Sequence, residues 1–189
     1  MSSTVTFTLD QYERLIACGA FGGQSHKPVE LIGGELRMMS PQGAEHAELV
    51  AKLNDWSHDV IDRMRLRIRI QSSIEIPESV SQPEPDVVWV EAKSYARRRP
   101  RPPEVLLLVE VADTSLAYDM GEKCQVYSAA GIRDYWVVDI AARTLHVFRT
   151  PQPGGYRTLL PLSGDDRIAP LASDRTALVV AELFRCLDS

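Results

Sequence analysis

The spacing of hydrophobic positions changes several times along the chain, and each change indicates a new element. Near the N-terminus, Thr8 and Gln11 have the spacing of a capping box, which predicts the start of a short helix. Two short apolar runs follow at 29–32 and 35–39, and the glycine pair between them suits the positive φ angles of a tight turn. The first forty residues therefore predict a helix and a β-hairpin.

The middle of the chain contains both helical and extended patterns. Apolar side chains recur near helical spacing over 44–63, which indicates a long amphipathic helix. From Arg65 to Ile70, basic and apolar residues alternate strictly, which predicts a strand with one buried face. Two further strands are predicted at 86–90 and 105–111. The second is apolar on both of its faces, which is typical of a central strand covered by helices on both sides.

The last third of the chain continues the alternation of helices and strands. A helix from about Tyr118 to Ala130 is predicted to end at Gly131. After it we expect a strand at 134–139, a hairpin of 145–149 with 156–160, and a short closing helix within 177–187. The chain has no repeats and no clear linker. We therefore expect a single α/β domain over 1–189, with a mixed central sheet flanked by helices.

The bulk composition narrows the classes of protein that are possible. With 189 residues, 44% of them apolar and 25% charged, the chain suits one soluble globular domain. It has no apolar run long enough to span a membrane and no basic start with an apolar run, so we expect a cytoplasmic protein. Cys18, Cys124 and Cys186 are far apart, which argues against a disulfide framework and a structural zinc.

The charge of the chain does not by itself indicate a partner. A net charge of -5 is not typical of nucleic-acid binding, because phosphate contacts are made by lysine and arginine. Arginines are nevertheless concentrated in two places. Those between Arg63 and Arg69 have two interpretations, the exposed face of an edge strand or a set of phosphate contacts. The second group forms either a solvated loop or a contact to a nucleic-acid backbone, and consists of Arg97, Arg98, Arg99 and Arg101.

Two carboxylates carry the clearest chemical signal. Asp86 begins one predicted strand and Glu110 lies near the end of the next, so the two would converge at one edge of the sheet if these strands pair. Taken alone, Asp86 is also compatible with a turn residue. Glu110 would be costly to bury without a partner in so apolar a strand. Two carboxylates and a backbone carbonyl suit Mg²⁺, which polarises phosphate esters and activates water.

These motifs, taken in order, resemble the PD-(D/E)XK nuclease superfamily, and most of all its Uma-type family of restriction-endonuclease-like proteins. The resemblance covers about residues 28–150 and rests on Pro85-Asp86, on Glu110, and on an aspartate, a lysine and a tyrosine in the following helix. One position departs from the superfamily pattern. Ala112 stands where the wider superfamily has lysine, and in the Uma-type family Lys123 matches the alternative place for that lysine.

The resemblance implies a Mg²⁺-dependent endonuclease, with Mn²⁺ as a possible substitute, that acts on DNA. Its implied metal ligands are Asp86, Glu110 and the carbonyl of Val111. Lys123 would orient water or stabilise charge on the phosphate, although it could equally be a structural partner of Glu110. The helical spacing puts Asp119, Lys123 and Tyr127 on one face. Possible accessory residues are Glu30, His46 and Tyr127, and His46 could instead cap its helix.

Two other functions stay open from the sequence. The chain could be an inactive nuclease-fold module that binds nucleic acid or a protein partner. It could also be a metal-dependent hydrolase that acts on RNA or on another phosphate ester. A homodimer is expected for an enzyme that cuts both strands of a duplex, because closed two-fold assemblies are common.

Overall fold

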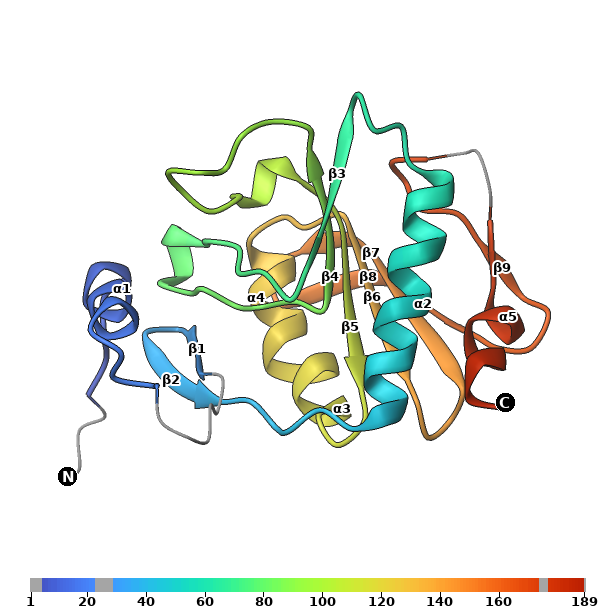
Figure 1. Ribbon diagram of the computed structural model, residues 1–189, viewed down its shortest axis with the longest axis horizontal. Coiled ribbons are helices and arrows are strands. Elements are labelled where there is room, and N and C mark those ends of the chain that lie inside the picture. The colour runs from blue at the N-terminus through green and yellow to red at the C-terminus, as the bar shows by residue number, and fades with distance from the viewer. Residues whose placement is uncertain (1–4, 23–28, 174–176, 189) are drawn as a thin grey trace.

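The computed structural model describes residues 5–22, 29–173 and 177–188, and its centre is a six-stranded mixed sheet (Figure 1). The strands lie in the order β3-β4-β5-β6-β7-β8. Only β5 and β6 run parallel to one another, and the other neighbours in this sheet are antiparallel. The strand bounds are β3 Leu66–Ile70, β4 Val87–Glu91, β5 Val105–Ala112, β6 Asp134–Asp139, β7 Thr144–Gln152 and β8 Gly155–Leu162. The predicted mixed α/β fold is confirmed.

Helices cover both faces of this sheet (Figure 1). The long helix α2, Ala44–Val60, packs on one face together with α5, Val180–Phe184. The other face is covered by three consecutive helical segments: α3 Leu116–Tyr118, a π-helical segment Asp119–Lys123, and α4 Cys124–Ala129. Strand β5 is buried on both sides because alternate residues point to opposite cores.

The N-terminal elements form a separate unit beside the sheet (Figure 1). Helix α1, Leu9–Ala17, begins with the predicted capping box, in which Thr8 and Gln11 bond reciprocally. The hairpin consists of β1, Val29–Ile32, and β2, Glu35–Met38. Its turn residues Gly33 and Gly34 have φ angles of 59° and 79°, which favour glycine. A β-bridge between Leu31 and Gln82 attaches the hairpin to the rest of the chain.

Several details differ from the sequence prediction. The helix expected over 118–130 begins at Leu116 and is interrupted by the π-helical segment. The last hairpin has longer strands than predicted, because its turn tightens around Gly154, whose φ is 85°. The patterns did not indicate the small sheet of β9, Arg167–Ile168, and β10, Leu178–Val179. No helix among the described residues has the length and apolar character needed to cross a membrane.

The register between β4 and β5 decides where the site forms. Val87 pairs with Val109 in an antiparallel ladder. Continuing this register by one residue brings Asp86 beside Glu110, at the end of the sheet nearest α3. Strand pairing therefore brings together two carboxylates that are twenty-four positions apart in the chain.

Candidate active site

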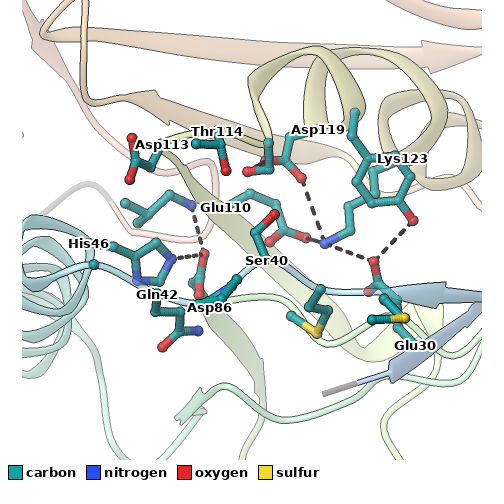
Figure 2. A pocket seen from close by; sticks show the side chains of 17 residues that line it. Glu30, Ser40, Gln42, His46, Asp86, Glu110, Asp113, Thr114, Asp119 and Lys123 are labelled. Atoms are coloured by element: carbon teal, nitrogen blue, oxygen red, sulfur yellow. Dashed lines mark hydrogen bonds and ion pairs between the residues drawn. The ribbon is translucent and has the colours of Figure 1, made fainter. Parts of the chain in front are cut away.

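An acidic pocket lies where the end of β5 meets the start of α2, the hairpin and the π-helical segment (Figure 2). Its volume is about 230 Å³. The acidic and basic side chains that line it, apart from His46, are five carboxylates and one lysine, which gives a formal charge of -4. These are Glu30, Asp86, Glu110, Asp113, Asp119 and Lys123. Such a pocket attracts cations and repels a bare phosphate.

Asp86 is fixed by contacts on two sides. Its Oδ2 accepts the backbone N–H of Val111 at 2.8 Å and lies 3.2 Å from Nε2 of His46. His46 belongs to the first turn of α2, so this helix contributes directly to the pocket. Asp86 is buried and its carboxylate links two strands and a helix, which is more than a turn residue requires.

Lys123 is buried among three carboxylates (Figure 2). Its Nζ lies 3.1 Å from Glu110 Oε1, 3.4 Å from Glu30 Oε1 and 3.7 Å from Asp119 Oδ1. Burial alone would lower the pKa of this lysine, but the three carboxylates outweigh burial and raise its pKa well above the usual range. Lys123 therefore keeps its positive charge at neutral pH.

Glu110 is 3% exposed, and burial raises the pKa of its carboxyl well above the ordinary value. Lys123 opposes this shift, whereas the negative charges of Asp119 and Asp86 add to it. Tyr127 donates its hydroxyl to Glu110 Oε1 at 2.7 Å. The charged form of Glu110 therefore depends on Lys123, and a further cation beside the carboxyl would favour it more.

A divalent cation fits the oxygen atoms that remain. The hydrogen bonds of Asp86 all end at Oδ2 and those of Glu110 at Oε1, so within the described ranges Oδ1 and Oε2 have no hydrogen-bond donor. One such oxygen from each carboxylate matches a hard ion that keeps several waters. Across the described parts of the chain, no group of three or more His, Cys, Asp or Glu side chains could hold a metal ion. The expected set has two carboxylates, with the carbonyl of Val111 as its third ligand.

The π-helical segment sets the directions of Asp119 and Lys123. Asp119 accepts the hydroxyl of Ser115 at 2.6 Å, and burial raises the pKa of its carboxyl. Lys123 and Tyr127 reach the same oxygen of Glu110, as expected for side chains on one helical face. π-helical segments are rare and are frequent at functional sites. Gly121 within the predicted helix is the only local signal of this interruption.

The hairpin supplies one wall of the acidic pocket. Glu30 on β1 accepts the hydroxyl of Tyr118 at 3.0 Å and the backbone N–H of Glu84 at 3.2 Å. On β2, Arg37 makes two hydrogen bonds to Glu122, at 2.8 and 3.3 Å. The sequence prediction included Glu30 but missed Tyr118, because its role depends on how the hairpin docks.

The family to which the chain belongs follows from a comparison with known families. The family model Uma2, described as "Putative restriction endonuclease", matches residues 9–178. The chain belongs to the Uma2 family. The match includes α1 before residue 28 and continues to residue 178, and so extends beyond the 28–150 range of the expected resemblance at both ends.

A solved structure has the same fold as this Uma2 chain. It is described as the crystal structure of "a putative nuclease belonging to DUF820" from Anabaena variabilis ATCC 29413. Its TM-score is 0.75 at 14% identity, and the alignment covers 97% of the Uma2 chain and 99% of the other. No curated protein matches the chain. The predicted family and fold are confirmed, and the description of the family supports a nuclease function.

The arginine-rich connection of this Uma2 chain does not reach the acidic pocket. Residues 92–104 join β4 to β5 at the opposite end of these strands from α3 (Figure 1). Three of the predicted arginines form ion pairs with acids. Arg98 pairs with Glu104 of the same connection. Arg99 pairs with Glu13 of α1 at 3.0 Å, and Arg101 pairs with Glu75 at 2.6 Å. Arg97 is exposed. Nucleic-acid contact by these arginines stays a prediction.

Proposed function

We propose that this Uma2 protein is a Mg²⁺-dependent endonuclease that hydrolyses DNA phosphodiester bonds, with Mn²⁺ as a possible substitute. The observation that carries the proposal is the arrangement of Asp86 and Glu110 beside a buried, charged Lys123. Each carboxylate offers one oxygen to the same acidic pocket. Because that pocket has a formal charge of -4, a bound cation would be needed before a phosphate group could enter.

The side chains around the pocket have distinct roles in this proposal. Asp86, Glu110 and the carbonyl of Val111 would hold the metal, which polarises the phosphate and lowers the pKa of a bound water. Lys123 keeps its proton and stabilises negative charge that develops on the phosphate oxygens. Tyr127 holds the carboxylate of Glu110. On the other side, His46 and the backbone N–H of Val111 hold Asp86.

Burial of the charged groups favours catalysis over the inactive-module alternative. Taking charges out of water costs free energy, and their mutual attraction offsets that cost only when the geometry is good. A module that only binds a partner needs no such group of acids around a lysine. We further propose a cytoplasmic location and a homodimer, both of which rest on the sequence.

The decisive experiment is a cleavage assay on purified protein. Duplex DNA, single-stranded RNA and a small phosphodiester would each be incubated with Mg²⁺, with Mn²⁺ or with EDTA. We expect DNA cleavage that EDTA and Asp86→Asn abolish and that Asp165→Asn, at an exposed acid outside the pocket lining, leaves unchanged. Faster cleavage of RNA or of the small ester would replace the proposed substrate class. Saturable DNA binding without cleavage under any condition would favour the inactive module.

A further inference from the structure

Two arginines of β3 project from the face of the sheet that carries Glu110. Arg67 lies opposite Val90 of β4, and Arg69 lies opposite Val88. Directly opposed residues of an antiparallel pair share a face, and Val88 in turn lies opposite Leu108 of β5. Leu108 and Glu110 are two positions apart and share that face as well. Arg67 and Arg69 are therefore on the Glu110 side of the sheet, on an edge strand.

The end of β3 is joined to the rim of the acidic pocket. The backbone N–H of Gln71 donates to the carbonyl of Asp86 at 3.0 Å. The side chain of Gln71 donates to Gln42 at 2.8 Å, and Gln42 lines the pocket. Arg67 and Arg69 are two positions apart on β3, about 6.6 Å along an extended strand, and Arg65 lies in the turn just before β3. They form a row that leads away from the pocket rim, hereafter the arginine row: Arg65, Arg67 and Arg69.

The positive charges of the arginine row are not neutralised by acids in the described parts of the chain. No ion pair involves any of the three within residues 5–22, 29–173 and 177–188, in contrast to the paired Arg98, Arg99 and Arg101. The Nε atom of Arg69 is buried and has no hydrogen-bond partner among the residues that the structure describes. The guanidinium of Arg69 lies 5.8 Å from the ring centre of Tyr95, which orients it. Charges that only discourage aggregation need no such orientation.

We propose that the arginine row binds the backbone of the DNA strand whose scissile phosphate enters the acidic pocket. This inference rests on the proposed function for DNA as the substrate. Guanidinium groups are the preferred partners of phosphate, and they would supply the attraction that a pocket of negative charge lacks. The row therefore contributes affinity for any sequence, and the pocket contributes the chemistry.

The test measures binding separately from cleavage. A fluorescein-labelled DNA duplex is titrated in EDTA at several salt concentrations, and the dissociation constant is read from fluorescence anisotropy. Each lost phosphate contact reduces the slope of log affinity against log salt by about 0.9. We expect a reduction of about 1.8 for the Arg67→Gln/Arg69→Gln double variant. The Arg133→Gln/Arg157→Gln control, at two exposed arginines without an ion pair among the described residues, makes the same change in net charge and should retain the wild-type slope.

The result has clear alternatives. Equal slopes for wild type and the β3 variant, or an equal or larger reduction in the control, would overturn the proposal. Arg67 is exposed, so Arg67→Gln alone tests the row if the double variant unfolds, with an expected reduction of about 0.9. If the wild type binds through the row but cleaves nothing, the proposed nuclease function fails and the row stands. If the wild type cleaves DNA and the β3 variant binds DNA as tightly as the wild type does, the proposed nuclease function stands and the role of the arginine row fails.

Discussion

Asp86 accepts a hydrogen bond from the backbone N–H of Val111 at 2.8 Å. Val111 directly follows Glu110, so this bond links the two carboxylates that we propose as metal ligands. This hydrogen bond fixes the relative position of the two carboxylates before any ligand is present. Because the carboxylates already hold their positions, little free energy is spent on rearranging them when a cation binds.

Two replacements of Asp86 distinguish the effect of its charge from the effect of its hydrogen bond to Val111. Asp86→Asn removes the charge and retains an oxygen that can accept from Val111, whereas Asp86→Ala leaves that buried N–H unpaired. We expect both variants to lose Mn²⁺ binding in isothermal titration calorimetry. In urea denaturation, the free energy of unfolding should be lower for the alanine variant than for the asparagine variant by about 1–3 kcal/mol. Equal stability of the two would contradict the role assigned to this hydrogen bond.

Lys123 is expected to stabilise the folded state as well as to assist catalysis. Lys123→Met leaves Glu30, Glu110 and Asp119 buried without their cation, so the free energy of unfolding in EDTA should fall by about 3–5 kcal/mol. Saturating Mn²⁺ should restore part of this loss, because the ion replaces the missing positive charge. The decisive measurement is DNA cleavage by this restabilised variant. Cleavage that stays low supports a catalytic role, and cleavage at the wild-type rate would show that the lysine is only structural.

Metal binding should be coupled to the release of a proton from Glu110. Burial raises the pKa of this carboxyl, so below that pKa a cation must displace its proton. We therefore expect the affinity for Mn²⁺ to increase as the pH rises towards that raised pKa. Calorimetry in buffers of different ionisation enthalpy would measure the protons released. The control is Asp165→Asn, which should bind Mn²⁺ with the same pH dependence as the wild type. An affinity for Mn²⁺ that does not change with pH would refute the prediction.

The same pKa shift has a consequence for the metal-free protein. Because the folded pKa of Glu110 lies above its unfolded value, the folded state binds more protons between the two. This contribution to stability is present below the unfolded pKa and is lost as the pH rises through the folded pKa. Glu110→Gln should make the free energy of unfolding less dependent on pH over that window. Urea denaturation across a series of pH values checks this, and identical pH profiles would exclude it.

Tyr127 is expected to position Glu110 by its hydroxyl group. Tyr127→Phe keeps the ring in the core and removes the donor that lies 2.7 Å from Glu110 Oε1. We expect a loss of about 1–3 kcal/mol in the free energy of unfolding, together with weaker Mn²⁺ binding. Tyr95→Phe is a control, because the Tyr95 hydroxyl makes one long contact near the surface. A similar cost for both variants would argue against the positioning role.

Local patterns along the chain determined most of the elements. The capping box at Thr8 and the glycine turn at Gly33-Gly34 act within a few residues, so they can be recognised without the fold. The alternation over 65–70 and the apolar run over 105–111 were sufficient to predict both strands, although Ile68 and Ile70 on the apolar face of the first are only partly buried. The cost of burying a charge in that run also marked Glu110 as a residue that needs a partner.

Only the tertiary structure decided which side chains meet. The register of β4 and β5 brings Asp86 beside Glu110, and docking of the hairpin brings Glu30 to Lys123. The same applies to the arginines, because pairing with acids distant in sequence neutralises Arg99 and Arg101, whereas nothing in the described chain neutralises the row on β3. The physical reason is that secondary-structure propensity and hydrophobic periodicity depend only on residues that are close together in the sequence. Ion pairs, by contrast, depend on distances that only the packing of separate elements defines.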